Sequence, residues 1–236
     1  MEVELFTKPS TYDSYITTNI ERRNFDEVVR QIAKHQSNPS ILDLCCGTGI
    51  FAREWLSRLN SVRYVGVDID EDFIVHAKSF GSGEFLQGDA VDFRLEDRFD
   101  VVMGTSAYHH IEDERKKAFL ENMKRHLREE GSIIIYEKFV APFFSSVEAV
   151  KSGARFYLER IEDIAREQDL NEERLYSLLT ELYLTSSRQF EYKVPFERFA
   201  EDVGKTGLKI IDEVKLWPLD DRFRNPNVGD FVVVLE

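Results

Sequence analysis

The run Ile41–Gly49 reads ILDLCCGTG and places one carboxylate just before two closely spaced glycines. Gly47 and Gly49 follow a short apolar segment, where a first strand is expected to pass into a helix. Glycines at such a junction allow backbone N–H groups and the helix N-terminus to approach a bound ligand closely. Asp43 lies inside the expected strand, where its charge would repel a pyrophosphate and attract a sulfonium or an ammonium group. Together these residues predict a cofactor site that favours a positively charged group.

The glycine loop taken alone leaves a second class of cofactor open. The run Gly47-x-Gly49-x-x-Ala52, with Asp68 19 residues after Gly49, satisfies a loose dinucleotide-binding fingerprint. A nicotinamide-dependent enzyme is therefore an alternative on this loop. Three features argue against it: the carboxylate before the loop, another carboxylate at Asp89 after the third expected strand, and an expected antiparallel end of the sheet.

Short apolar segments alternate with helical patterns through the middle of the chain, which is typical of a parallel sheet with helices on both faces. The expected strands are Ile41–Cys45, Tyr64–Val67, Phe85–Leu86, Phe99–Met103, Ser132–Tyr136, Leu208–Leu216 and Phe231–Leu235. Helical stripes between them include Phe51–Leu59 and Leu120–Leu127, and Gly131 is expected to cap the second of these helices. No helical pattern separates the last two strands, so they should pair antiparallel.

These elements predict an α/β fold. Its core is a doubly wound, seven-stranded, mostly parallel sheet with an antiparallel last strand. Residues 141–189 show no strand signal, and their apolar residues fall at helical spacing, which predicts two helices laid over the domain as a cap insertion. We interpret residues 1–236 as a single domain.

Five segments, in chain order, resemble the sequence motifs of the class I S-adenosylmethionine (SAM)-dependent methyltransferase family, which has a Rossmann-like fold. They are ILDLCCGTG, YVGVDID, FLQGDA, FDVVMGTSAYHHIED and REEGSIIIYE. The similarity covers Ser40–Glu137 strongly and Pro195–Glu236 by expected topology alone. The resemblance implies SAM as the cofactor, S-adenosylhomocysteine as its product and a small molecule as the methyl acceptor.

The resemblance also assigns cofactor contacts to particular positions. They are Tyr15, Asp43, Cys45, Gly47, Gly49, Asp68, Ile69, Asp89, Ala90 and Thr105. The two glycines would approach the methionine part of SAM, and Thr105 would lie near the sulfonium. Asp68 would accept hydrogen bonds from both ribose hydroxyls, as a carboxylate can. Ile69 would pack on the adenine, whose amino group would meet Asp89.

The same resemblance implies functions for two further segments, residues 1–24 and residues 141–189. In similar enzymes an N-terminal stretch, here residues 1–24, folds over SAM as a lid, and aromatic rings such as Tyr12 and Tyr15 can face a sulfonium. The alternative is an ordinary amphipathic helix. Relatives place substrate-recognising elements where residues 141–189 lie, although the aromatic side chains there could equally form the seam between two helices.

Candidate catalytic residues follow the fourth and fifth expected strands. Tyr108, His109 and His110 lie where a substrate would enter, and an imidazole can act as a general base near neutral pH. We therefore predict catalytic roles for Tyr108, His109 and Glu137. Each has a structural alternative, because a histidine can cap or pack a helix and a glutamate at a strand end can face solvent. The family's NPPY-type motif is absent from GTSAYHH, which disfavours base-methylating DNA enzymes and related protein-glutamine enzymes.

Composition limits the partners and the setting. A formal net charge of −13 and a pI near 5.0 disfavour a nucleic-acid-binding face. No apolar run is long enough for a membrane span, and MEVELFTKPS lacks the pattern of an export signal. The adjacent cysteines Cys45 and Cys46 suit neither a disulfide framework nor a metal cage, so we expect a cytoplasmic protein without a metal site. A homodimer is compatible with the sequence.

Two other functions remain open at this point. A SAM-binding sensor without methyl transfer would carry the same cofactor motifs. A SAM-modifying enzyme similar to carboxy-SAM synthases is suggested faintly by EKF at Glu137–Phe139 with a long helical insertion after it, and Arg188 is the arginine that such an enzyme would need for a carboxylate.

Overall fold

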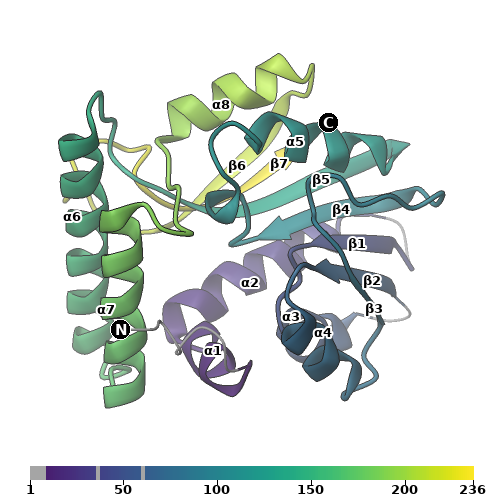
Figure 1. Ribbon diagram of the computed structural model, residues 1–236, viewed down its shortest axis with the longest axis horizontal. Coiled ribbons are helices and arrows are strands. Elements are labelled where there is room, and N and C mark those ends of the chain that lie inside the picture. Colours follow the sequence, from purple (N-terminus) through teal and green to yellow (C-terminus); the bar gives the residue numbers. More distant parts are fainter. Residues whose placement is uncertain (1–8, 36–37, 60–61) are drawn as a thin grey trace.

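The computed structural model describes residues 9–35, 38–59 and 62–236, and a single sheet of seven strands forms its centre (Figure 1). The strand order is β3-β2-β1-β4-β5-β7-β6. The strands are β1 Ser40–Leu44, β2 Arg63–Asp68, β3 Glu84–Gln87, β4 Phe99–Thr105, β5 Leu127–Phe139, β6 Ile210–Trp217 and β7 Gly229–Leu235. The first five strands pair in parallel, whereas β7 is antiparallel to both of its neighbours. The predicted α/β fold with an antiparallel last strand is confirmed.

Helices cover both faces of this sheet (Figure 1). They are α1 Pro9–Ile16, α2 Asn19–Ile32, α3 Ile50–Glu54, α4 Glu71–Lys78, α5 Lys116–Arg125, α6 Ser146–Arg166, α7 Glu172–Ser187 and α8 Phe196–Lys205. Two short 3₁₀ helices, Leu56–Arg58 and Tyr108–His110, follow α3 and β4. Successive side chains of a strand point to opposite faces, so β1 sends Ile41 into one core with α2 and α3, and Leu42 into the other core with α5 and α8.

Both faces of the central strands are therefore buried. Every residue of β1 and β4 lies in the interior, which explains why most of their positions are apolar without a polar residue at every second place. The closing strands β6 and β7 pair antiparallel as predicted, because residues 218–228 join them without a crossover helix.

Two local predictions were wrong. Gly131 does not cap a helix: α5 ends earlier, with His126 as its C-cap, and Gly131 lies inside β5. A register shift between Phe99 and Val101 accommodates extra residues of β5 at this point, and a β-bulge of this kind interrupts a strand without ending it. The expected helix over Phe51–Leu59 is instead the short α3 followed by one 3₁₀ turn.

Residues 141–189 form the two long helices α6 and α7, which stand side by side at one end of the sheet (Figure 1). They pack closely where Gly153 of α6 faces Thr185 of α7. Helix α7 also contacts α1, so the N-terminal helix and the inserted pair lie over the same side of the molecule. Within the described part of the chain, no helix is long and apolar enough to cross a membrane.

Candidate cofactor and substrate site

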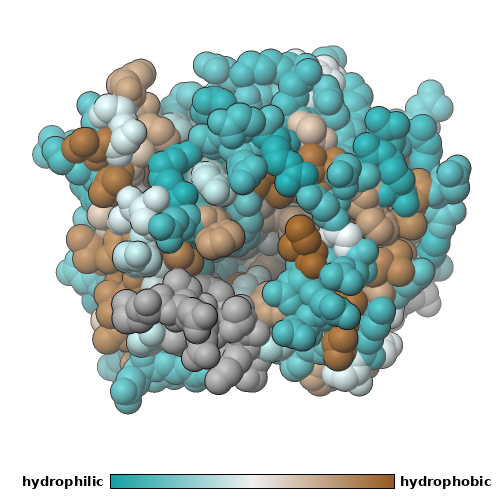
Figure 2. Space-filling model, in the orientation of Figure 1, coloured by the Kyte–Doolittle hydropathy of each residue, from teal (hydrophilic) through white to brown (hydrophobic). Residues whose placement is uncertain are grey.

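A cavity of about 400 Å³ opens between the end of the sheet and helix α7. Cys45, Gly47, Asp68 and Ser106, which line it, follow or end β1, β2 and β4, and Glu181 and Leu184 of α7 face them. The cavity therefore lies at the carboxyl ends of the strands, beside the point between β1 and β4 where the strand order reverses, which is the usual binding crevice of an open α/β sheet. Figure 2 shows this face hollowed near its centre, with hydrophobic side chains beside the opening.

The loop after β1 forms the floor of the cavity. The backbone N–H groups of Cys45 and Cys46 donate to the carbonyl oxygen of Val67 at 2.8 and 3.0 Å, which ties the loop to β2. Gly47 has a φ of 54°, a conformation that side chains with a Cβ rarely adopt, and a Cβ there would lie 3.4 Å from the ring of Tyr12. The glycine therefore leaves bare backbone facing the cavity.

Asp68 ends β2 and holds this loop. Its carboxylate accepts the backbone N–H of Gly47 at 2.8 Å and that of Asp70 at 3.0 Å. Burial raises the pKa of Asp68, and these two hydrogen bonds oppose the rise. A carboxylate has about four acceptor positions, so two remain for hydroxyl donors of a ligand. The neighbouring Ile69 lines the cavity with 67% of its surface exposed, which is unusual for isoleucine and suits an apolar ring.

Three predicted cofactor positions lie behind the cavity wall rather than on it. Asp43 is fully buried and accepts the hydroxyl of Tyr64 at 2.7 Å, and burial raises the pKa of Asp43 to about 7. Gly49 begins α3 and packs beneath the ring of Phe85. Ala90 lies in the core below the sheet edge.

Asp89 and Thr105, two further predicted contacts, are not among the residues that line the cavity. Asp89 accepts the backbone N–H of Val91 at 2.9 Å and pairs with Arg115 at 2.7 Å. Although partial burial acts to raise it, these contacts lower the pKa of Asp89. Thr105 is buried at the end of β4, and the next residue, Ser106, lines the cavity instead. The side chain of Tyr15 lies outside the described residues, whereas Tyr12 from the same helix lines the cavity.

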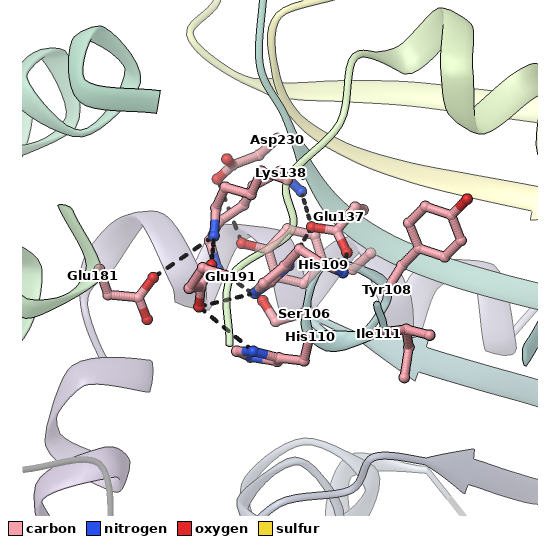
Figure 3. Close-up of polar contacts among 12 residues, drawn as sticks. Ser106, Tyr108, His109, His110, Ile111, Glu137, Lys138, Glu181, Glu191 and Asp230 are labelled. Atoms are coloured by element: carbon pink, nitrogen blue, oxygen red, sulfur yellow. Dashed lines mark hydrogen bonds and ion pairs between the residues drawn. The ribbon is translucent and has the colours of Figure 1, made fainter. Parts of the chain in front are cut away.

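The three residues of the 3₁₀ helix Tyr108–His110 point in different directions (Figure 3). Tyr108 is fully buried and donates its hydroxyl to Asp202 of α8 at 3.0 Å, on the side away from the cavity. The prediction of a catalytic role for Tyr108 is therefore corrected, because packing against α8 removes its hydroxyl from any ligand in the cavity. His110, by contrast, lines the cavity with 46% of its side chain exposed.

His109 and Glu137 form a buried pair. The ring Nδ1 of His109 lies 2.5 Å from one oxygen of Glu137, and the backbone N–H of His109 donates to the other at 3.0 Å. Burial and the nearby Lys193 lower the pKa of His109, while burial raises the pKa of Glu137. These two predicted catalytic residues are thus brought together, with Nε2 of His109 directed toward Glu191 at 3.7 Å (Figure 3).

The opposite wall contains residues that sequence reasoning missed. Glu181 and Leu184 come from α7, and Phe190 and Glu191 from the segment after it. Lys193 contacts Glu191 and lies 3.8 Å from Glu181. The one available signal was Glu181 itself, which lies three residues after Leu178 on the buried stripe of α7, a position where a carboxylate needs a partner.

Comparisons with known proteins agree with this geometry. A family model described as a methyltransferase domain matches residues 41–131. The malonyl-[acyl-carrier protein] O-methyltransferase 2 of Ilyobacter polytropus is 26% identical over 147 residues, which are 60% of this chain and 55% of that protein. A malonyl-[acyl-carrier protein] O-methyltransferase of a Paenibacillus species is 28% identical over 138 residues, covering 52% of this chain and 49% of its own length. The matches thus span about half of these curated relatives.

Solved structures share the fold. A SAM-dependent methyltransferase of Clostridium acetobutylicum superposes with a TM-score of 0.60 at 12% identity, covering 91% of each chain. The magnesium protoporphyrin IX methyltransferase of Synechocystis, solved with bound S-adenosylhomocysteine, gives 0.57 at 13% identity and covers 92% of this chain and 83% of its own.

The matched residues 41–131 contain the glycine loop, Asp68 and the histidine pair. The strand order with antiparallel β7 extends the similarity to the end of the chain. Residues 41–131 are therefore similar to a methyltransferase domain, and the chain has the fold of solved SAM-dependent methyltransferases.

Proposed function

We propose that this chain transfers the methyl group of SAM to a small molecule and releases S-adenosylhomocysteine. The observation that carries the proposal is the cavity, which has a cofactor-type loop on one wall and polar side chains from α7 and the segment after it on the other. Its volume is within the range of pockets that enclose small ligands. The curated relatives named above act on a malonyl group carried by a protein and one structural neighbour acts on a porphyrin, so the family members at hand differ widely in acceptor.

The sheet side of the cavity suits the cofactor. We assign the methionine part of SAM to the backbone at Cys45 and Gly47, the ribose hydroxyls to Asp68, and the adenine ring to Ile69 and Phe73, all of which line the cavity. Arg115 already donates a hydrogen bond to one carboxylate oxygen of Asp89. Asp89 would therefore accept the adenine amino group only while it also binds Arg115.

The far side of the cavity is assigned to the acceptor. His110, Phe190 and Glu191 line it there, together with Glu181 from α7. This agrees with a substrate role for the insertion at residues 141–189. Tyr12 packs against Phe73 with ring centroids 5.3 Å apart, which supports a lid role for the N-terminal helix.

The His109–Glu137 pair is proposed to activate the acceptor. In-line attack on the methyl carbon needs an acceptor atom with a free electron pair, and a hydroxyl or protonated amine must first lose a proton. His109 can serve by accepting that proton at Nε2 or by holding a cation that stabilises the resulting negative charge. Tyr108 has no part in this proposal because its hydroxyl faces α8.

A SAM-modifying reaction that requires an arginine is not favoured. Arg188 pairs with Asp113 at 2.6 Å, and the described residues that line the cavity include no arginine. We therefore retain methyl transfer to a separate acceptor.

The test is the formation of S-adenosylhomocysteine from SAM in the presence of pooled hydroxyl, carboxyl, thiol and amine acceptors, with each active pool then divided. SAM binding is measured in parallel by calorimetry. The expected result is acceptor-dependent product that, at sub-saturating SAM, falls strongly in Asp68→Ala and is unchanged in Asp72→Ala, a change on the exposed face of α4. Tight SAM binding without turnover by any acceptor would favour the sensor function and contradict the proposal.

A further inference from the structure

Three side chains with metal-ligating atoms converge at the acceptor side of the cavity (Figure 3). Nε2 of His109 lies 3.7 Å from Oε1 of Glu191, and Nδ1 of His110 lies 3.5 Å from the same oxygen and 2.9 Å from the backbone carbonyl oxygen of Phe190. One ligand atom from each residue falls within 4.8 Å of the others. Within residues 9–35, 38–59 and 62–236, no other group of three histidine, cysteine, aspartate or glutamate side chains has this spacing.

We infer that His109, His110 and Glu191 bind a divalent cation of the zinc type at the wall of the cavity. Two imidazole nitrogens and one carboxylate oxygen form a donor set that zinc and neighbouring first-row metals accept, with a further position left for water or substrate. Metal–ligand bonds of about 2.0–2.2 Å place tetrahedral donors about 3.3–3.6 Å apart. The observed separations from Glu191 are close to this range, and rotation of the His110 ring away from the carbonyl oxygen of Phe190 would free its nitrogen for the ion.

The surroundings of His109 match those of a metal ligand. Glu137 lies against its Nδ1 at 2.5 Å and also accepts its backbone N–H, which holds both the ring and the backbone in place. A carboxylate at one imidazole nitrogen keeps the proton there and directs the lone pair of the other nitrogen outward, as in the carboxylate–histidine–metal arrangement. Nε2 of His109, turned toward Glu191, is that free nitrogen.

The charges around the histidines are balanced between acids and bases. Glu137, Glu181 and Glu191 are buried near them, and so are the lysines Lys116, Lys138 and Lys193. Lys193 contacts Oε2 of Glu191, which leaves Oε1 facing both rings. A metal ion would therefore bind at Oε1 while Lys193 holds the other oxygen.

The role of this site in catalysis rests on the proposed methyl transfer. If a metal ion binds here, the atom that accepts the methyl group is expected to be an oxygen. A hydroxyl bound to the metal would release its proton to water more readily, because the cation stabilises the alkoxide. The oxygen lone pair would then form the bond to the methyl carbon, while the carbon–sulfur bond breaks and its electron pair stays on sulfur. The products are a methyl ether and neutral S-adenosylhomocysteine.

The experiment measures metal binding directly and needs no methyl transfer. Protein treated with EDTA and exchanged into metal-free buffer is titrated with Zn²⁺ by calorimetry and with Co²⁺ by visible absorption. We expect one equivalent to bind and to be lost in His110→Ala and Glu191→Gln. Glu137→Gln should weaken binding roughly 10–100-fold, as expected for loss of a partner that orients a ligand. The control His35→Ala removes a histidine that contacts Ser132 and should leave binding unchanged.

His110→Ala decides the outcome if Glu191→Gln disturbs folding, because His110 is half exposed. Absence of one-to-one binding in the unmodified protein, or its persistence in His110→Ala, would overturn the inference. Titration of the same samples with SAM separates the two proposals: SAM binding without metal binding rejects only the metal site, and metal binding without SAM binding rejects only the methyltransferase function.

Discussion

Two carboxylates near the glycine loop differ because of where they lie on their strands. Asp43 lies within β1, so its side chain points into the layer between the sheet and a helix and meets Tyr64. Asp68 ends β2, where the backbone turns away and the carboxylate reaches both the loop and the cavity. One residue type therefore serves the core at one position and the ligand site at another.

Replacement of Asp68 by alanine should weaken SAM binding. A hydrogen bond to a charged acceptor contributes about 1.5–3 kcal/mol, so the loss corresponds to roughly 10–150-fold in affinity. Isothermal calorimetry measures the affinity, and circular dichroism checks that the protein remains folded. Because Asp68 also anchors Gly47, part of the effect would arise from the loop itself. Unchanged affinity in a folded variant would refute the assignment.

The buried carboxyl of Asp43 makes stability depend on pH. Its pKa is about 7 in the folded protein against 3.8 for the ordinary group, so between these pH values the folded state binds a proton that the unfolded state releases. Stability contributed by the protonated form is therefore lost as pH rises toward 7. Asp43→Asn removes this titration and should gain up to about 4 kcal/mol relative to the unmodified protein above neutral pH.

Urea unfolding at several pH values measures the difference in free energy of unfolding between Asp43→Asn and the unmodified protein. We expect this difference to grow from about pH 4 to about pH 7 and then to level off. Asp72→Asn, on the exposed face of α4, is the control and should show no such growth. A difference that does not change with pH would show that the Asp43 carboxyl is ionised throughout.

At the scale of elements, the junction between β1 and α3 depends on close contact as well as on backbone shape. Gly49 has a φ of 70° and begins α3, where a Cβ would lie 2.8 Å from the ring of Phe85 and 3.0 Å from the Cβ of Ala77. The glycine therefore allows α3 to approach β3 and α4. Gly81 has a similar φ of 64° but faces open space.

Substitution of these two glycines separates two contributions to the free energy of unfolding: the strain of a left-handed backbone and the overpacking by an added Cβ. Gly81→Ala should cost about 1–2 kcal/mol from the left-handed backbone alone. Gly49→Ala adds overpacking, which typically costs a further 1–3 kcal/mol. Denaturant unfolding of both variants gives the comparison. Equal destabilisation would mean that Phe85 moves aside freely and that the contact is unimportant.

At the scale of the whole molecule, a buried ionic cluster joins the inserted helices to the sheet. Arg160 of α6 is fully buried, pairs with Glu21 of α2 at 2.6 Å and contacts Asp230 of β7 through both carboxylate oxygens. Asn24 also donates to Asp230 at 2.6 Å. Elements from the start, the middle and the end of the chain therefore share one polar centre.

Arg160→Met should destabilise the protein strongly, by about 3–5 kcal/mol, because it leaves two buried carboxylates without their main cation. Arg166→Met on the same helix is the matched control, since its pairs with Glu162 and Asp163 involve a largely exposed guanidinium and contribute about 0–1 kcal/mol. Urea denaturation would measure both. Similar values for the two variants would mean that the cluster adds little to stability.

The segments on the sheet side of the cavity were predictable because the rules that govern them are local. The apolar runs, the glycine spacing and the carboxylate of Asp68 at a strand end indicated that Gly47 and Asp68 lie at one edge of the sheet, and both line the cavity, since the carboxyl ends of parallel strands share one edge. The antiparallel end followed from the missing helix before Phe231. The misplaced C-cap at Gly131 shows the limit of such rules, because a β-bulge depends on the neighbouring strand.

The wall of the cavity opposite the glycine loop was decided by the tertiary structure alone. Tyr108, His109 and His110 form one 3₁₀ turn, in which successive side chains point about 120° apart, and only packing against α8 and β5 determines which of them reaches the cavity. Glu191 comes from a segment about eighty residues later in the sequence, and α7 carries Glu181 to the same wall. Contacts between segments so distant arise when the chain folds, which is why the sequence alone indicated the glycine loop and Asp68 but not the approach of Glu181 and Glu191 to the histidine pair.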